Sequence, residues 1–141
     1  MTVYVDTSVL VAVVTIEAKT SHVQAWLGEQ EPGSLAISEW VATEFSAALS
    51  IKLRSGSIDA AHRANALAVF ARLREDDFTV LPISVLQFRT AARFADQHVH
   101  GLRAGDALHV AICSDHGATL ATLDRRLAEA GTALGLGTML L

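Results

Sequence analysis

The sequence predicts an α/β fold with a largely parallel sheet, because short apolar runs alternate with longer helical segments. Two of these runs are followed by an aspartate: Val3-Tyr4-Val5 directly by Asp6, and 118–122 by Asp124 after one residue, Leu123. Ligands of open parallel sheets bind beyond the carboxyl ends of the strands, where both side chains are expected. With 141 residues, 51% of them hydrophobic, the chain is expected to form a single domain, 1–141.

The elements are assigned from apolar periodicity and from the residues that begin and end helices. Ser38 and Asp59 are good N-caps, Gly56 is a good stop, and Ser84 with Gln87 forms a capping-box pattern. Strands are predicted at 2–5, 34–37, 78–82, 118–122 and, weakly, within 136–141. Helices are predicted at 7–15, 20–29, 38–54, 59–75, 84–97, 104–115 and 125–130.

Composition excludes several classes of protein. No apolar run is long enough for a transmembrane helix, and the start of the chain lacks the basic residues of a signal peptide. Cys113 is the only cysteine, so a disulfide framework is excluded and a reducing, cytoplasmic location is expected. The net charge of −4 argues against binding nucleic acid by overall basicity, but it does not exclude an enzyme that acts on nucleic acid.

Glu44 is the acid that the sequence explains least well as a surface residue. On a helix it would be surrounded by Trp40, Val41 and further apolar side chains, namely Ala47, Ala48 and Ile51. A glutamate is rarely left unpaired in such a stripe. The simplest alternative is a glutamate at the edge of the stripe that pairs with an arginine.

Three other acids have local explanations when each is considered alone. Asp6 and Asp124 are suited to cap helices, and Asp106 lies in the first turn of an apolar helix, where the dipole favours it. His109, one turn later, is better explained as a hydrogen-bond partner than as a metal ligand. Burying several carboxylates together requires a cation, and oxygen ligands suit Mg²⁺ or Mn²⁺ rather than zinc. We therefore expect Asp6, Glu44, Asp106 and Asp124 to form one metal site.

Other catalytic patterns are absent or weaker. The six histidines show neither an HExxH motif nor zinc spacing, and no Walker loop is present. A phosphatase of the haloacid-dehalogenase type would need a second aspartate where this chain has Ser8. Ser8 and Thr122 are interpreted as hydroxyls that assist the neighbouring acids or a metal-bound water, with plain helix capping as the alternative.

These residues together resemble PIN-domain ribonucleases, and among them the VapC toxins of toxin–antitoxin pairs. The resemblance extends over the whole chain and depends on four segments: Val5-Asp6-Thr7-Ser8-Val9-Leu10, Glu44, Arg103-Ala104-Gly105-Asp106-Ala107-Leu108-His109-Val110-Ala111 and Leu120-Ala121-Thr122-Leu123-Asp124. Leu127 stands where an aromatic residue is often found, and further acids of that region are missing. Whether one or two metals bind is therefore left open.

The resemblance implies an α/β/α sandwich and an Mg²⁺- or Mn²⁺-dependent endoribonuclease that leaves a 5′-phosphate and a 3′-hydroxyl. Asp6, Glu44, Asp106 and Asp124 would match the acidic quartet of the family, and Ser8 or Thr122 its assisting hydroxyl. It also implies a homodimer held inactive by a cognate antitoxin. Arg103, Arg125 and Arg126 lie near the acids in sequence and are candidates to contact RNA phosphates, or simply solvated surface residues.

Two other functions fit the same residues. One is a PIN-like binding module for an antitoxin or another partner, with weak activity. The other is a metal-dependent phosphatase. An intact acidic quartet favours the nuclease, because a pure binding domain gains nothing from the desolvation cost of four acids.

Overall fold

The protein is an α/β/α sandwich, described by a computed structural model of residues 1–141. Five parallel strands form one sheet in the order β3-β2-β1-β4-β5, with β1 at Val3–Val5, β2 at Leu35–Ser38, β3 at Thr79–Leu81, β4 at Thr119–Thr122 and β5 at Thr138–Leu140. The helices are α1 (Thr7–Val14), α2 (Thr20–Gly28), α3 (Glu39–Arg54), α4 (Ala60–Asp76), α5 (Val85–Asp96), α6 (Ala104–His116) and α7 (Arg125–Ala133), with one 3₁₀ turn, η1 (His98–His100). The predicted fold class and all the predicted strands and helices are confirmed, and only η1 was not predicted.

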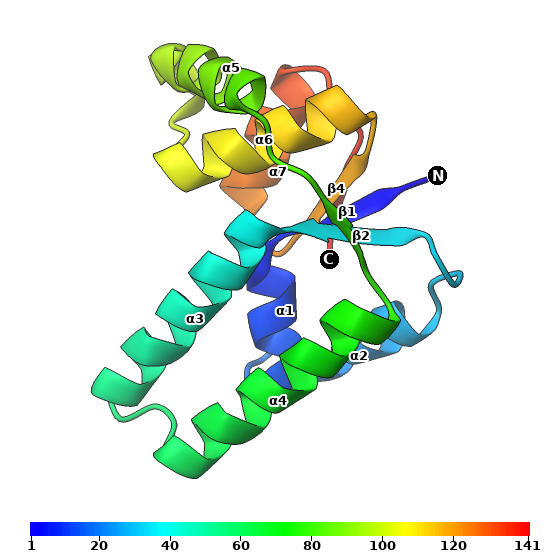
Figure 1. Cartoon of the computed structure of the whole chain (residues 1–141). Helices are drawn as coiled ribbons and strands as arrows, with labels where there is room; N and C mark the ends of the chain where they lie inside the picture. Colours follow the sequence, from blue (N-terminus) through cyan, green and yellow to red (C-terminus); the bar gives the residue numbers. More distant parts are fainter.

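The strand order places the change of direction between β1 and β4. The chain moves from β1 to β2 and β3 on one side and then returns to β4 and β5 on the other. Figure 1 shows α1 to α4 in one layer and α5 to α7 in the layer across the sheet. Because open parallel sheets bind ligands where the strand order reverses, the carboxyl ends of β1 and β4 are the expected location of a site.

The core explains why the strands lie in the middle. Val3, Tyr4 and Val5 of β1 are almost fully buried, and they belong to a cluster of 27 buried hydrophobic residues that both helical layers cover. Parallel strands that are covered on both faces are apolar along their whole length rather than alternating. None of the helices combines the length and the apolar character that a membrane crossing requires.

Local signals at helix ends have mixed outcomes. Asp59 accepts a hydrogen bond from the His62 amide, and Ser84 forms the expected capping box with Gln87. Ser38 does occupy the N-cap position of α3, but its side chain makes no capping hydrogen bond. The predicted position of Ser38 is therefore confirmed, but its hydroxyl bonds to Tyr4 instead of capping the helix.

Candidate active site

Asp6 lies at the point where β1 ends and α1 begins, directly beside β4. Val5 and Ala121 form the last pair between β1 and β4. Asp6 and Thr122 follow them directly, so they lie side by side at the carboxyl ends of the two strands. The Thr122 hydroxyl donates to Asp6 Oδ2 at 2.8 Å, and the Ser8 hydroxyl donates to Oδ1 at 2.6 Å. Asp6 is only 5% exposed, so these two donors replace part of the water that it lost on folding.

The same two hydroxyls connect Asp6 to the segment that carries Asp124. Thr122 Oγ1 accepts from the Asp124 amide at 2.9 Å, and Ser8 Oγ accepts from the Leu123 amide at 3.0 Å. Ser8 and Thr122 thus fix the ends of β1 and β4 against each other. The Asp124 carboxylate itself caps α7 by accepting from the Arg126 and Leu127 amides. The alternative prediction for Asp124, that it caps a helix, therefore agrees with the contacts that it makes in this structure.

Glu44 projects from α3 toward the same end of the sheet. The buried stripe of α3 consists of Val41, Phe45 and Leu49, next to which Glu44 lies, whereas Ile51 is 57% exposed. Placing Ile51 in the stripe was wrong, because the helix turns that side chain to solvent. Ala47, assigned to the same stripe, is exposed as well.

The partners of Glu44 are a histidine and a threonine, not an arginine. Glu44 Oε1 accepts from the Thr7 hydroxyl at 2.7 Å and is 2.5 Å from His109 Nε2. The contact with Thr7 joins Glu44 to the residue that follows Asp6. His109 is buried on α6 and acts as a hydrogen-bond partner, as expected, but the acid that it contacts is Glu44 rather than Asp106.

The buried Asp6 and the half-buried Glu44 have opposite shifts in pKa. Burial raises the pKa of Asp6, and the hydrogen bonds from Ser8 and Thr122 and the nearby His109 offset only part of that effect. Burial also acts to raise the pKa of Glu44, but the hydrogen bond and charge of His109, the Thr7 hydroxyl and the charge of Arg103 outweigh it and lower the pKa. The Asp6 charge is therefore the one that the fold leaves less well compensated.

Asp106 lies in the first turn of α6, close to Glu44. A Cβ on Gly105 would be 2.7 Å from Glu44 Oε2 and 3.2 Å from Trp40 Nε1, so α6 approaches α3 as closely as a glycine allows. The Asp106 carboxylate accepts long hydrogen bonds from Arg103, 3.4 Å to its amide and 3.5 Å to Nε. Thr7, the neighbour of Asp6, bonds to Glu44, and Gly105, the neighbour of Asp106, packs against Glu44. The backbone segments that carry these three acids therefore adjoin.

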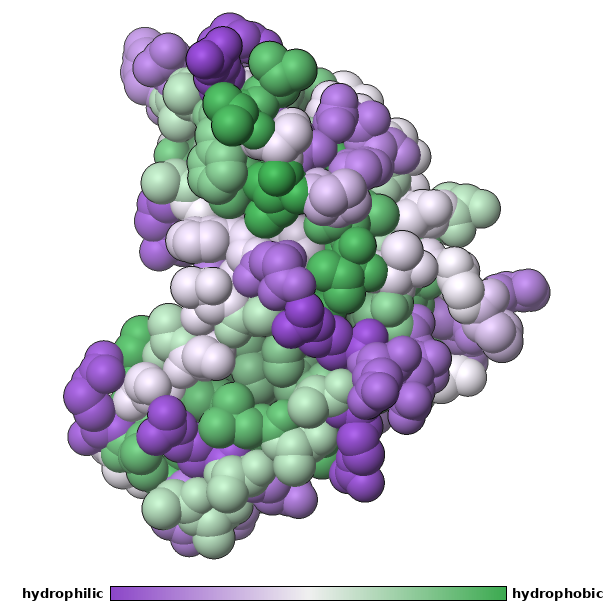
Figure 2. Space-filling model, in the orientation of Figure 1, coloured by the Kyte–Doolittle hydropathy of each residue, from purple (hydrophilic) through white to green (hydrophobic).

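Three arginines lie at the border of this region. Arg103 precedes α6, and Arg125 and Arg126 open α7. All three are exposed, and Arg126 donates to the Gly101 carbonyl at 3.3 Å. Figure 2 shows the outline of the molecule indented between the two helical layers on the side where α3 begins. The arginines therefore provide positive charge next to an acidic site.

The donor set suits a hard divalent cation by its chemistry. Four carboxylates and two hydroxyls provide only oxygen, as Mg²⁺ and Mn²⁺ prefer, and a cation would offset the poorly compensated charge of Asp6. As the side chains stand, no three of the acid, histidine and cysteine side chains are arranged to hold an ion. Asp6 is engaged by hydroxyls, and Asp106 and Asp124 are engaged with the amides of helix ends. Asp106 and Asp124 each use a single carboxylate oxygen in these contacts, Oδ2 and Oδ1 respectively.

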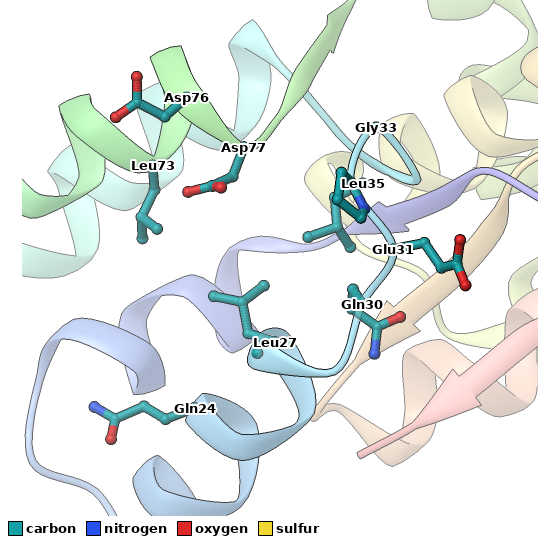
Figure 3. A pocket seen from close by; sticks show the side chains of 11 residues that line it. Gln24, Leu27, Gln30, Glu31, Gly33, Leu35, Leu73, Asp76 and Asp77 are labelled. Atoms are coloured by element: carbon teal, nitrogen blue, oxygen red, sulfur yellow. The ribbon is translucent and has the colours of Figure 1, made fainter.

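A separate cavity lies at the opposite edge of the sheet. It has a volume of about 420 Å³ and includes Glu31, Asp76 and Asp77 in its lining, as Figure 3 shows. Leu35 at the start of β2 also lines it, which places it at the amino-terminal edge. The cavity is therefore distinct from the region of the four predicted acids.

Several residues of the site were not predicted from sequence. Tyr4, Thr7, Ser38 and Gly105 all contact Glu44 or His109 directly or through one another. The available signal was weak: Tyr4 lies in an apolar strand, where a buried hydroxyl requires a partner, but nothing in the sequence identifies that partner.

The fold and the site define an α/β/α protein in which Asp6 and Asp124 follow the two strands at the switch in strand order, the usual ligand position of such folds. The family model of the PIN domain matches residues 3–132. The chain therefore belongs to the PIN domain family, a family of nucleases that generally use a divalent metal ion, and the resemblance seen in the sequence is confirmed at that level.

Solved structures of similar fold are known. PAE2754 from Pyrobaculum aerophilum is 25% identical with a TM-score of 0.71, over 98% of this chain and 89% of that chain. VapC20 from Mycobacterium tuberculosis, described as a sarcin-ricin loop cleaving toxin, is 19% identical with a TM-score of 0.73, over 96% of both chains. VapBC2 from Rickettsia felis, solved bound to promoter DNA, is 14% identical with a TM-score of 0.67, over 100% and 99%. The last two show the fold alone, and no curated protein matches the sequence.

Proposed function

We propose that this protein is an Mg²⁺- or Mn²⁺-dependent endoribonuclease that acts as the toxin of a toxin–antitoxin pair. The observation that carries the proposal is the connected acidic region between β1 and β4, in which Ser8 and Thr122 join the segments of Asp6 and Asp124. Membership of a nuclease family supports the reaction class. Structural neighbours that are toxins or toxin–antitoxin complexes support the biological role.

In this proposal Asp6, Glu44 and Asp106 hold the cation, with Asp124 as a further ligand. When bound, a divalent cation lowers the pKa of water and offsets the charge on the phosphate oxygens. Ser8 and Thr122 hold the Asp6 carboxylate in place through both of its oxygens. Arg103, Arg125 and Arg126 would contact backbone phosphates of the RNA, which orients the strand without reading its bases.

The proposed partners are an antitoxin and a second copy of the chain, in the cytoplasm where the RNA substrate is made. Exposed apolar side chains on α5 support the homodimer: Val85 is 68% exposed, Leu86 69% and Phe88 56%, and Figure 2 shows hydrophobic atoms gathered over this helix. If α5 forms the dimer contact, Leu86→Glu should convert a dimer to a monomer in sedimentation measurements. A dimer that survives this charge would place the contact elsewhere.

The deciding experiment is cleavage of a mixed RNA pool. Wild type with Mg²⁺ should cut, whereas wild type with EDTA and Asp6→Asn with Mg²⁺ should not. Asp77→Asn is the matched control, because it removes a carboxylate from the cavity at the amino-terminal edge and should cut like wild type. Equal cutting in all four samples would refute the nuclease assignment. Absence of cutting by a wild-type protein that binds Mn²⁺ would favour the catalytically weak binding module, and hydrolysis of small phosphate esters alone would favour the phosphatase.

A further inference from the structure

His109 is a buried polar residue for which the proposed reaction has no direct role. It lies on α6, 2% exposed, and both ring nitrogens have partners. Nε2 is 2.5 Å from Glu44 Oε1, and Nδ1 is 2.9 Å from the Tyr4 hydroxyl. The Tyr4 hydroxyl is in turn 2.7 Å from Ser38 Oγ.

These contacts form a continuous chain of hydrogen bonds through the interior, from Ser38 through Tyr4 and His109 to Glu44. Ser38 and Tyr4 are both fully buried, so no water competes for the hydroxyls. An ionised carboxylate only accepts, so His109 Nε2 carries a hydrogen and donates to Glu44. The Tyr4 and Ser38 hydroxyls can rotate to match Nδ1 in either charge state of the ring. The imidazole plane is thus fixed from behind.

The chain engages only one of the two Glu44 oxygens. Thr7 and His109 both donate to Oε1, while Oε2 faces the narrow space above Gly105 and has no hydrogen-bond partner. Because two donors bind the same oxygen, they define the orientation of the carboxylate. Oε2 occupies the space that a Cβ on residue 105 would fill, and this space is free because residue 105 is a glycine. Glu44 is therefore held with one oxygen engaged and the other available.

We propose that His109 is a positioning residue that, held by Tyr4 and Ser38, orients Glu44 so that Oε2 can serve as a ligand to the divalent cation. The inference rests on the proposed function, because it assigns a role at the same site. Metal ligands are commonly oriented by hydrogen-bond partners of this kind, and loss of such a partner typically costs about 10–100-fold in metal affinity or activity. The rival explanation is that the chain only satisfies buried polar groups and contributes to stability alone.

The test measures Mn²⁺ affinity by calorimetry, thermal unfolding in EDTA, and RNA cleavage as a function of Mg²⁺ concentration. His109→Leu removes the donor to Glu44, whereas His109→Gln retains an amide N–H that can reach it. Tyr4→Phe removes only the hydroxyl behind the ring. His116→Leu is the matched control on the same helix, because His116 contacts Gln87 and the Pro82 carbonyl instead.

We expect His109→Leu to weaken Mn²⁺ binding by about 10–100-fold and to raise the half-saturating Mg²⁺ concentration for cleavage by a similar factor. His109→Gln should restore most of the affinity, Tyr4→Phe should lower it by a smaller factor, and His116→Leu should leave it unchanged. A His109→Leu protein that melts at lower temperature but binds Mn²⁺ like wild type would overturn the inference. Where His109→Leu does not fold, an unchanged Mn²⁺ affinity of Tyr4→Phe would do the same.

Asp6→Asn separates this inference from the proposed function. If wild type binds Mn²⁺ and Asp6→Asn does not, the metal site is supported, whatever the His109 variants show. In that case an effect of His109→Leu supports the positioning role, and no effect refutes that role alone. A wild-type protein that binds no Mn²⁺ would refute the metal site and the positioning role together.

Discussion

Asp6 carries a buried charge whose desolvation its two hydroxyl partners only partly offset. Its raised pKa means that the folded protein binds this proton more tightly than the unfolded chain does. Above the raised pKa the ionised Asp6 therefore lowers the free energy of unfolding, and this cost disappears as the pH falls below the ordinary value of 3.8. The ionised form of Asp6 therefore destabilises the folded protein rather than stabilising it.

We expect Asp6→Asn to raise the melting temperature of the metal-free protein at neutral pH, by about 2–4 °C for each kcal/mol of relieved cost. The asparagine keeps an oxygen that accepts from a hydroxyl, but it carries no charge. Thermal unfolding in EDTA between pH 7 and pH 3 measures the effect, which should shrink toward the acid end. A variant that melts below wild type at neutral pH would contradict a poorly compensated charge.

Gly105 sets the distance between α6 and Glu44. An alanine Cβ would meet Glu44 Oε2 at 2.7 Å, closer than real Cβ atoms approach, so Gly105→Ala must displace Glu44 or α6. We expect a loss of about 1–3 kcal/mol in the free energy of unfolding, together with weaker RNA cleavage. Chemical denaturation and the cleavage assay measure the two effects.

Gly28→Ala provides the control for this substitution. Gly28 is also helical, but an added Cβ would have no neighbour within 4 Å. Alanine there should be neutral or stabilising by about 0.4–1 kcal/mol, with cleavage unchanged. If both variants behave alike, the approach of α6 to Glu44 is not the constraint that the structure indicates.

At the scale of single residues, the sequence identified the unusual acid but not its partner. Glu44 stands out because a carboxylate beside an apolar stripe needs a partner, and that reasoning is local to one helix. His109, 65 residues away, is brought to Glu44 only by the packing of α6 against α3. No local pattern specifies such a contact, and the arginine partner considered as the alternative to a metal site is not the partner that the structure shows.

At the scale of the elements, helix ends were predictable where the capping side chain has no competing partner. Ser84 and Gln87 satisfy each other within one turn, so their pattern alone determines the start of α5. Ser38 has the same capping chemistry, but its hydroxyl bonds to Tyr4 from a neighbouring strand. A hydrogen bond between two strands of the sheet takes the place of the capping hydrogen bond. No pattern in the sequence indicates this change of partner.

The capping box of α5 gives a test of stability that is separate from the site. Ser84→Ala removes the acceptor of the Gln87 amide and should lower the free energy of unfolding by about 1 kcal/mol. RNA cleavage should be unchanged, because α5 contributes none of the four acids. Chemical denaturation and the cleavage assay check the two statements, and a loss of activity in a folded Ser84→Ala protein would implicate α5 in the site.

At the scale of the whole molecule, the order of the strands is what brings the site together. The sequence placed Asp6 and Asp124 at the ends of strands, but whether β1 and β4 are neighbours depends on contacts between residues more than a hundred positions apart. The structure makes them adjacent and places the change of direction between them. The segments that carry Asp6 and Asp124 therefore adjoin, and Thr7 joins the first of them to Glu44 of α3.

A cation held by this region would bind the folded protein but not the unfolded chain, and it would connect the two helical layers. At a free Mg²⁺ concentration of 100 times the dissociation constant, binding adds about 2.7 kcal/mol to the free energy of unfolding. We therefore expect Mg²⁺ to raise the melting temperature of wild type by about 5–10 °C. Asp77→Asn should show the same rise, because Asp77 lies at the opposite edge, whereas Asp6→Asn should show almost none. An equal rise in Asp6→Asn would mean that Mg²⁺ binds outside the acidic region, and the metal site proposed here would then be wrong.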